Sequence, residues 1–219
     1  MHYNLLFNGC SWTKGSCLDE LGLDEETNRF SGVIAQKTDK TVCNIGKSGT
    51  GNDSICRRTI KWFEEGNTCD HAIIQWTFKS RVEWIDEDNN QRQFLPPKEA
   101  PAMNRMNPDA REALYSYYGQ FYTDPYGFAN LYKNMSFLET YFAMKNQSYD
   151  FVRIADRREI TNKDYFWKSL LKNQYPQNLL RLLGNWSSEL FFDGHPNVTG
   201  HEIIADWMID NFEYLKNAL

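Results

Sequence analysis

The stretch "LLFNGCSWTKG", residues 5–15, places a short apolar run directly before a turn that contains Asn8, Gly9, Cys10 and Ser11. Apolar residues followed by Asn-Gly are typical of a buried strand that ends in a tight turn. Such a turn requires Gly or Asn for its backbone conformation, but it does not require a thiol beside a hydroxyl. The turn therefore carries two candidate nucleophiles, and the rest of the sequence has to decide between them.

Two further segments of the first half of the chain are apolar. Residues 40–46, "KTVCNIG", and residues 70–78, "DHAIIQWTF", have the character of strands, and residues 51–66 between them have the apolar spacing of a helix. Strands and helices that alternate in this way form a doubly wound parallel sheet. We therefore expect one α/β domain built on such a sheet over residues 1–219. Ligands of such sheets lie beyond the carboxyl ends of the strands.

The second half of the chain continues the alternation after an interruption at residues 86–127, which contain most of the seven Pro residues. A long segment with little periodicity inside a compact domain is usually functional or disordered. We predict that it is an aromatic cap over the strand ends, either a wall for the substrate or a cap with a small core of its own. We further expect helices at 30–37, 124–147, 163–183 and 201–219 and a strand at 149–156.

Composition narrows the classes of ligand. The net charge of −5 and the pI of about 5.4 argue against nucleic acid as the main partner, because phosphate binding requires clustered Lys and Arg. The chain contains 7 Trp, 12 Tyr and 14 Phe at a mean hydropathy of −0.65. So many aromatic rings either fill the core or line a groove in which sugars stack. A carbohydrate ligand is therefore one of the two interpretations that the composition favours.

Cysteine usage and the amino-terminal residues indicate the compartment. The five Cys residues form no C-x-x-C pair, so a zinc site is not expected. The first nine residues, "MHYNLLFNG", lack the basic and apolar regions of a signal peptide, and no apolar run is long enough for a membrane span. We expect reduced thiols and a cytoplasmic protein, with release by cell lysis or incorporation into a virion as alternatives.

Near the end of the chain, residues 191–201, "FFDGHPNVTGH", carry Asp193 and His195 just before the last helix. A serine hydroxyl becomes a good nucleophile when a base removes its proton, and the base needs a partner that fixes its tautomer. Ser11, His195 and Asp193 are the three residue types that this chemistry requires.

These segments resemble the SGNH hydrolase (GDSL-type esterase) superfamily. Gly9 to Trp12 matches its first block with Cys in place of the usual Asp, and "NIGKSG", residues 44–49, matches every fixed position of its second block. "DGHPNVTGH", residues 193–201, fits the last block, which ends in a catalytic His. More narrowly, the blocks are similar to a branch common in phage and environmental bacterial genomes.

The resemblance implies a single three-layer α/β/α domain of the flavodoxin-like type. It also implies a serine esterase that removes a small acyl group, such as acetyl, from a carbohydrate or a similar alcohol. Ser11 would be the nucleophile, His195 the general base and Asp193 the partner of the imidazole. The backbone N–H groups of Ser11 and Gly49 would bind the oxyanion. The resemblance implies no metal and no organic cofactor, and the oligomeric state is left open.

Two departures from the family pattern affect the site. The third block usually supplies an Asn side chain to the oxyanion hole, and this chain has Gln75-Trp76-Thr77 there. Thr77, Arg81 or Asn52 could substitute for that Asn. The family usually places Asp three residues before His, whereas Asp193 is two residues before His195. A dyad whose imidazole is oriented by a backbone carbonyl is therefore the alternative to a triad.

The choice between the two nucleophiles follows from strand geometry. Adjacent residues that leave a strand point in opposite directions, so Cys10 enters the core if Ser11 faces the strand ends. Two other functions remain open at this point. One is a carbohydrate-binding or virion protein that keeps the fold with weak or no catalysis, and the other is an O-acyltransferase in which a sugar hydroxyl replaces water.

Overall fold

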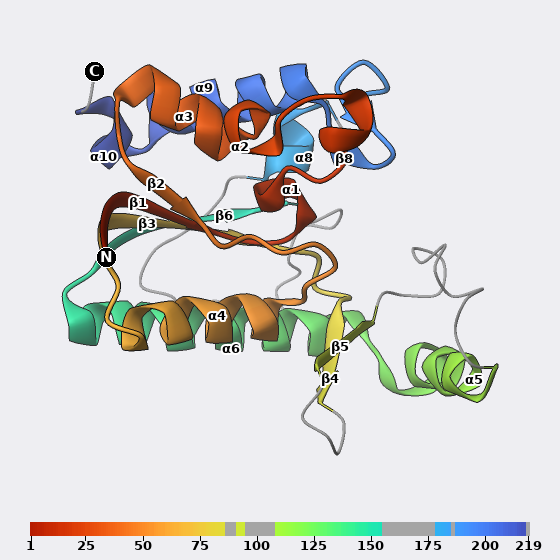
Figure 1. Cartoon of the computed structure of the whole chain (residues 1–219). Coiled ribbons are helices and arrows are strands. Elements are labelled where there is room, and N and C mark those ends of the chain that lie inside the picture. The colour runs from red at the N-terminus through yellow and green to blue at the C-terminus, as the bar shows by residue number, and fades with distance from the viewer. Residues whose placement is uncertain (86–90, 95–107, 155–177, 185–186, 218–219) are drawn as a thin grey trace.

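The computed structural model describes residues 1–85, 91–94, 108–154, 178–184 and 187–217. Its centre is a parallel sheet with the strand order β2-β1-β3-β6 (Figure 1). The four strands are β1 (His2–Asn8), β2 (Val42–Asn44), β3 (Thr68–Trp76) and β6 (Ser148–Arg153). This order is that of the first four strands of flavodoxin-like sheets, so the predicted fold class is confirmed.

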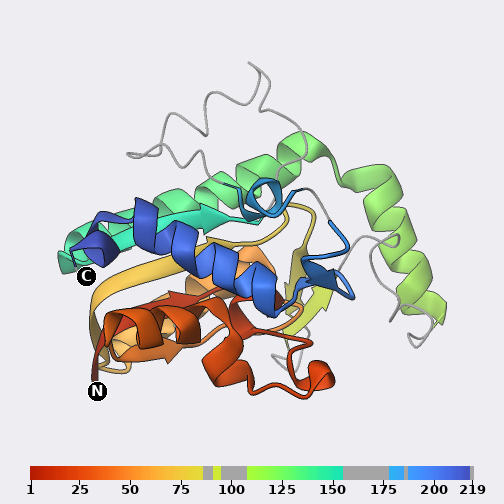
Figure 2. The same ribbon diagram turned by 90° about the horizontal axis from the view of Figure 1, so that it is seen from above.

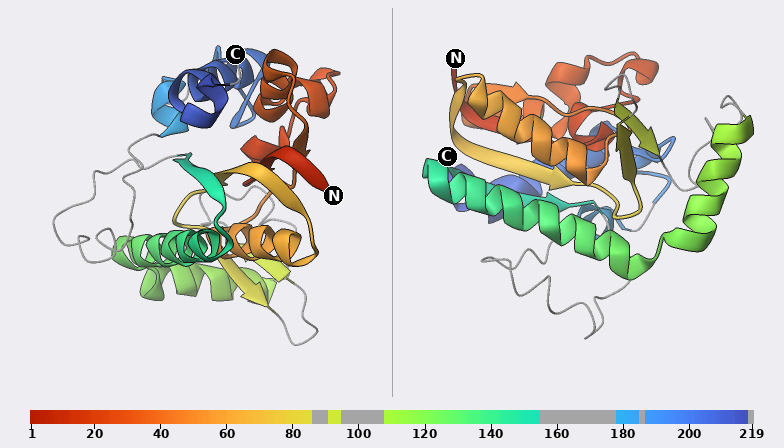
Figure 3. Two further views of the ribbon diagram at one scale, coloured as in Figure 1. Left: turned by 90° about the vertical axis from the view of Figure 1, so that its left-hand side faces the viewer. Right: turned by 90° about the horizontal axis from the view of Figure 1, so that it is seen from below.

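Helices cover both faces of the sheet, which gives three layers (Figures 1 and 2). One face is covered by α3 (Phe30–Thr38) and α9 (Val198–Asn211). The other is covered by α4 (Asn52–Glu64) and α6 (Asp124–Lys145), which lie side by side in Figure 3.

The alternation of side chains along β1 builds both cores. Leu5 and Phe7 are buried in the cluster that includes α3 and α9, while Leu6 is buried in the cluster that includes α4 and α6. Successive residues of a strand point to opposite faces, so a continuous apolar run is what a sheet covered on both faces requires.

The path of the chain predicts where a ligand would lie. From β1 the chain passes through α3 to β2, on one side of β1, and then through α4 to β3, on the other side. Because α3 and α4 lie on opposite faces, the carboxyl ends of β1 and β3 flank the point at which the winding reverses (Figure 1). Ligands of open α/β sheets bind at such a point.

Several element boundaries differ from the expectation. The last predicted helix is two helices, because α9 ends at Asn211 and α10 (Glu213–Lys216) begins after Phe212. The start of α9 is set by Asn197, whose Oδ1 accepts a hydrogen bond from the Gly200 N–H at 3.0 Å. The helix predicted at 163–183 lies largely outside the described residues. Its described end contains the short helix α8 (Leu179–Leu182).

The segment between β1 and α3 contains three short elements. They are α1 (Ser11–Lys14), a 3-10 turn η1 (Asp19–Leu21) and α2 (Glu25–Asn28). These elements connect β1 to α3 and pass beside the carboxyl end of β1 (Figure 2).

The segment predicted as a cap, residues 86–127, is described in part. β4 (Val82–Ile85) pairs antiparallel with β5 (Gln91–Phe94), and α5 (Pro108–Ser116) is followed by the π-helical turn η4 (Tyr117–Phe121). α5 lies outside the three layers, beyond the amino-terminal end of α6 (Figures 1 and 3). That the whole segment covers the strand ends stays a prediction.

The aromatic residues of this segment contact one another. The ring centroids of Tyr117 and Tyr118 are 5.2 Å apart, and Tyr118 lies 5.4 Å from Tyr122. Tyr122 in turn lies 6.3 Å from Tyr126, which is 52% exposed. The rings therefore form a small cluster with an exposed end, which combines features of both predicted alternatives.

None of the described helices is both long and apolar enough to cross a membrane.

Candidate active site

Ser11 is the first residue of α1, at the carboxyl end of β1, and it is 4% exposed. The turn before it depends on Gly9, because a Cβ there would lie 2.1 Å from Thr13 Oγ1 and 2.9 Å from Gln75 Oε1. The missing side chain lets α1 start immediately after the strand. Thr13 Oγ1 in turn donates to Gln75 Oε1 at 2.8 Å, which joins α1 to β3.

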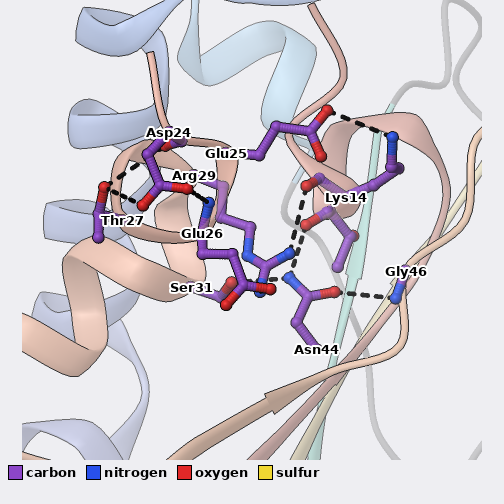
Figure 4. Close-up of polar contacts among 10 residues, drawn as sticks. Lys14, Asp24, Glu25, Glu26, Thr27, Arg29, Ser31, Asn44 and Gly46 are labelled. Atoms are coloured by element: carbon purple, nitrogen blue, oxygen red, sulfur yellow. Dashed lines mark hydrogen bonds and ion pairs between the residues drawn. The ribbon is translucent and has the colours of Figure 1, made fainter. Parts of the chain in front are cut away.

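Asn44, at the end of β2, holds α1 from the other side (Figure 4). Its Nδ2 donates to the Thr13 carbonyl and to Ser31 Oγ, both at 2.7 Å, and its Oδ1 accepts from the Gly46 N–H at 2.8 Å. Lys14 adds an ion pair with Glu25 at 3.2 Å. The short helix that carries Ser11 is therefore fixed to neighbouring elements by its backbone and its side chains.

Cys10 is fully buried and belongs to the core cluster on the α3 side of the sheet. Contrary to the prediction from strand geometry, the side chains of Cys10 and Ser11 do not point in opposite directions, because Ser11 begins a helix. Its Sγ lies 3.5 Å from Gln75 Oε1. Ser11 Oγ lies 3.8 Å from Cys10 Sγ, its one hydrogen-bond contact within the described part of the chain. The thiol thus lies in the core, and the Ser11 hydroxyl is buried beside it.

His195 lies on a β-hairpin of two short strands, β7 (Phe191–Phe192) and β8 (His195–Pro196). The two residues between them, Asp193 and Gly194, have φ angles of +44° and +73°. Asp-Gly is the favoured sequence for a two-residue hairpin turn, which requires positive φ at both positions. The turn contacts α1 directly, because Trp12 Nε1 donates to the Gly194 carbonyl at 3.3 Å.

The imidazole of His195 is oriented by a backbone group. Its Nδ1 lies 2.9 Å from the carbonyl oxygen of Asp193, and a carbonyl only accepts, so Nδ1 carries the proton. We expected the Asp193 carboxylate to do this. That side chain is exposed and makes no hydrogen bond or ion pair with the other described residues. The D-x-H spacing exists because Asp193 is a turn residue, and its carbonyl takes the place of the carboxylate.

Cys17 is a contact of His195 that the sequence did not reveal. Its Sγ lies 3.3 Å from His195 Nδ1, on the same side of the ring as the Asp193 carbonyl. Burial, followed by the charges of Glu20 and Asp193, raises the pKa of the Cys17 thiol to about 11. The thiol is therefore neutral at physiological pH and does not provide a negative charge for an imidazolium.

Burial lowers the pKa of His195 below its usual value of 6.5. The Asp193 carbonyl and carboxylate act in the opposite direction, and the positive charge of Arg81 lowers the pKa further. The lowered pKa favours a neutral His195 near pH 7, and its Nε2 has no hydrogen-bond partner among the described residues.

Ser11 and His195 lie on adjoining elements, since α1 contacts β8. No hydrogen bond joins Ser11 Oγ to the imidazole among the described residues. Catalytic hydrogen bonds of enzymes without substrate are often long and tighten when a ligand binds. The elements that carry Ser11 and His195 thus lie next to each other, but their side chains share no hydrogen bond among the described residues.

Gly49 has a φ of +73° and lies in the loop after β2. This loop is fixed to the Ser11 turn, because the Lys47 N–H donates to the Gly9 carbonyl at 3.1 Å and Ser48 Oγ lies 2.5 Å from Ser16 Oγ. Neither the Ser11 N–H nor the Gly49 N–H has a hydrogen-bond partner in the described part of the chain. Both predicted backbone donors are therefore unoccupied.

The side chain of Asn52 is used to hold the end of β3. Its Oδ1 accepts from the Thr77 N–H at 2.9 Å, and its Nδ2 lies 3.4 Å from the Thr77 carbonyl. Helix α4 begins at this residue, with Gly51 at the N-cap position. Thr77 Oγ1 is buried and lacks a hydrogen-bond partner among the described residues.

Arg81 is the third side chain predicted as a possible oxyanion donor. Its Nη1 donates to the Thr50 carbonyl at 3.3 Å, and its guanidinium carbon is 5.5 Å from the ring centroid of Phe78. Its Nε is buried without a hydrogen-bond partner in the described residues. Arg81 is thus close to the Gly49 loop, and its positive charge lowers the pKa of His195.

Among the residues that the structure describes, no group of three or more His, Cys, Asp or Glu is arranged to hold a metal ion.

No protein-family profile and no curated protein matches the sequence. The fold does match solved structures. The psychrotrophic esterase EstA from Pseudoalteromonas sp. superposes with a TM-score of 0.56 at 13% identity, over 98% of both chains. TesA gives 0.52 at 14% identity over 99% of both chains. The acetyl xylan esterase Est2A from the rumen bacterium Butyrivibrio proteoclasticus gives 0.54 at 11% identity, over 96% of this chain and 64% of that one.

These similarities extend over nearly the whole chain, at identities that establish the architecture. Together with the strand order and the layers of helices, they show that this chain has the three-layer α/β/α fold of the SGNH (GDSL-type) esterases.

Proposed function

We propose that this protein is a serine esterase that removes a small acyl group from a carbohydrate or a similar alcohol. The observation that carries the proposal is the imidazole of His195. Its Nδ1 proton is directed to the Asp193 carbonyl at 2.9 Å, so Nε2 is the basic nitrogen on a hairpin that contacts the helix of Ser11. The similarity of fold to an acetyl xylan esterase supports the class of substrate.

In this mechanism the Ser11 hydroxyl attacks the ester carbonyl while His195 Nε2 takes its proton. The imidazolium then gives that proton to the leaving alkoxide, and an acyl-enzyme remains. Water, activated by the same nitrogen, hydrolyses the acyl-enzyme. Asp193 acts through its backbone carbonyl, which keeps the ring in the required tautomer.

The oxyanion of the tetrahedral intermediate is stabilised by the N–H groups of Ser11 and Gly49, which have no other partner in the described chain. Thr77 and Arg81 are the candidates for a third donor, because each has a polar atom without a hydrogen bond. Asn52 contributes indirectly, since its amide positions Thr77. One oxyanion donor is worth on the order of 3 kcal/mol of transition-state stabilisation.

One observation favours a second candidate, a carbohydrate-binding protein of the same fold with weak or no catalysis. The side-chain amides near the strand ends are engaged elsewhere, because Gln75 Nε2 donates to the Trp76 carbonyl at 2.9 Å and Asn52 is bound to Thr77. The oxyanion hole would then lack its third hydrogen-bond donor. An acyltransferase would use the same acyl-enzyme with a sugar hydroxyl in place of water.

The test is hydrolysis of p-nitrophenyl acetate by the wild type and by the Ser11→Ala, His195→Ala and Cys10→Ala variants. We expect Ser11→Ala and His195→Ala to lose activity and Cys10→Ala to retain it. Activity that survives Ser11→Ala and is lost in Cys10→Ala would reverse the nucleophile. Absence of turnover in every protein, together with no labelling of Ser11 by a fluorophosphonate, would favour the binding protein.

A further inference from the structure

A cavity of about 230 Å³ lies at the same edge of the sheet as the candidate active site. Its walls come from α4, from the segment after β3, from β4 and from α6, elements that meet at the lower right of Figure 1. The volume is below the roughly 300–1,000 Å³ of pockets for drug-sized ligands, so it suits a single charged group and the ring that carries it.

The lining is strongly charged. The six ionisable side chains with a full charge are Arg57, Lys79, Arg81, Lys133, Asp53 and Glu83. Four of them are cations and two are carboxylates, so the sign of a complementary ligand depends on whether the carboxylates are available.

Both carboxylates are already engaged. Asp53 accepts hydrogen bonds from Asn130 Nδ2 at 2.8 Å and Asn134 Nδ2 at 3.1 Å, and it pairs with Lys133 Nζ at 3.3 Å. Although burial acts to raise the pKa of Asp53, these bonds and the Lys133 charge lower it, so the group stays ionised. A cationic ligand would therefore have to displace existing protein contacts.

The second carboxylate, Glu83, pairs with Arg57 at 2.5 Å and has a side chain that is 3% exposed. Lys79 pairs with Asp124 at 3.4 Å, and its ammonium group lies 3.7 Å from the ring centroid of Phe128. Three of the four cations are thus partly neutralised by a neighbouring carboxylate.

Arg81 differs from these three. Within the described part of the chain it has no ion pair, and its polar contacts are limited to the Thr50 carbonyl. Its Nε is buried without a partner. Because an unpaired guanidinium in a partly buried position is costly, an anion that accepts from it gains both charge and hydrogen bonds. The cavity therefore has an excess of positive charge centred on Arg81.

Tyr126 adds a surface for a sugar ring. It lines the cavity and is 52% exposed, at the open end of the tyrosine cluster on η4 and α6. An apolar ring face beside cationic groups matches a saccharide that carries a negative charge.

We propose that this cavity binds the anionic group, a carboxylate or a sulfate, of an acidic saccharide whose ester is presented to Ser11. The inference rests on the proposed function for the ester, and it adds that the substrate is charged. Arg81 connects the two regions, because it contacts Thr50 beside the Gly49 loop and its charge acts on His195. The binding of the anion can be measured without any hydrolysis.

The first experiment is calorimetric titration of the full-length Ser11→Ala variant at low salt. The probes are trigalacturonate for a carboxylate, 6-sulfated N-acetylglucosamine for a sulfate and cellotriose as the uncharged reference. We expect at least one anionic probe to bind about tenfold or more tightly than cellotriose, since hydrogen bonds to charged groups are the strong ones. The affinity should fall when NaCl is added. Equal binding of charged and uncharged probes would overturn the proposal.

A matched pair of lysines on α6 tests the location. Lys133 and Lys145 each pair with a carboxylate of α4, Asp53 at 3.3 Å and Glu64 at 3.0 Å, and their side chains are 56% and 48% exposed. Only Lys133 is part of the cavity lining. In the Ser11→Ala background, Lys133→Met should weaken the anionic probe severalfold and Lys145→Met should not. Equal effects of the two substitutions would place the anion elsewhere.

Arg81→Met should weaken the anionic probe about tenfold or more, and Arg81→Lys should restore part of that loss because the charge is kept. Thermal unfolding of each variant checks that the fold is intact. If the wild type hydrolyses no ester but the anionic probe binds and depends on Lys133, the esterase proposal fails and the anion site stands. If esters are hydrolysed and no anionic probe is preferred, the anion site fails and the esterase proposal stands.

Discussion

Cys17 Sγ lies 3.3 Å from His195 Nδ1, although the two residues are 178 positions apart in the chain. The contact requires an unusual backbone, because Cys17 has a φ of +76° in the left-handed region. Together with the Asp193 carbonyl, the thiol occupies the side of the imidazole at which a triad carboxylate would lie. A group attached to Cys17 would therefore press on the imidazole of His195.

Alkylation of Cys17 should inactivate the esterase slowly at pH 7 and faster as the pH rises. The thiolate is the reactive form, and the pKa of this thiol is raised to about 11, so the rate with iodoacetamide should rise about tenfold per pH unit from pH 7 to pH 10. Loss of p-nitrophenyl acetate hydrolysis is the measurement, and Cys17→Ser should be protected. Rapid inactivation at pH 7 would contradict the raised pKa.

Asp193→Asn should leave kcat/KM within about threefold of the wild type. Asn tolerates positive φ and keeps the backbone carbonyl that binds His195 Nδ1. If the carboxylate were a triad member, the same substitution would lower kcat on the order of 10⁴-fold.

The control for Asp193→Asn is Asp206→Asn. Asp206 is an exposed carboxylate on α9 that pairs with Lys37, away from the hairpin. A loss of several orders of magnitude at Asp193 with none at Asp206 would return the carboxylate to the mechanism.

The acid limb of the pH profile should lie below pH 6.5. His195 must be neutral to accept the Ser11 proton, and burial lowers its pKa, so activity is present above the lowered pKa and is lost as the pH falls through it. The measurement is kcat/KM for p-nitrophenyl acetate between pH 4 and pH 8. A half-maximal value above pH 6.5 would show that the imidazole is stabilised as a cation.

His201 should make the fold sensitive to acid. It is fully buried, its Nδ1 accepts the Phe30 N–H at 3.2 Å, and burial followed by the charges of His195 and Arg29 lowers its pKa to about 3. Between about pH 6.5 and pH 3 the unfolded chain therefore binds a proton that the folded one excludes. The free energy of unfolding should fall with decreasing pH by up to about 1.4 kcal/mol per unit from this group.

The measurement is urea unfolding of the wild type and of His201→Gln from pH 7 to pH 4. The variant is expected to be less stable at pH 7 and to approach the wild type as the pH falls, because it lacks that protonation. Parallel curves for the two proteins would mean that His201 does not titrate in this way.

Gly9→Ala should destabilise the fold by about 1–3 kcal/mol, because the added Cβ would meet Thr13 Oγ1 at 2.1 Å. Gly119→Ala is the matched control, since no atom lies within 4 Å of its ideal Cβ and its φ is not positive. Urea midpoints of the two variants give the comparison. A stable Gly9→Ala variant with full activity would show that the close approach of α1 to β3 is not needed.

The sequence predicted the sheet because its strands are buried on both faces. Continuous apolar runs such as residues 70–78 have few alternatives in an α/β chain, and the helices that alternate with them indicate a parallel sheet. Element ends were less predictable. Phe212, for example, interrupts the last helix, although the amphipathic pattern continues beyond it.

The positions of the candidate residues were predictable where a local motif places them. Ser11 follows its strand, and His195 precedes its helix. The Asp-Gly pair between "FF" and "HP" was a readable signal of a two-residue hairpin, and it would have assigned Asp193 to the turn. Cys17 and the charged cavity had no such signal, because their contacts join segments that are distant in the sequence.

The length of the hairpin has a consequence for variation in this protein. With two residues in the turn, His195 pairs directly with Phe192, and the side chains of a strand alternate between its faces. Insertion or deletion of a single residue there would transfer the imidazole to the opposite face, even with every chemical group of the site retained. Catalytic competence in related chains should thus be judged by counting residues in this turn as well as by the presence of histidine.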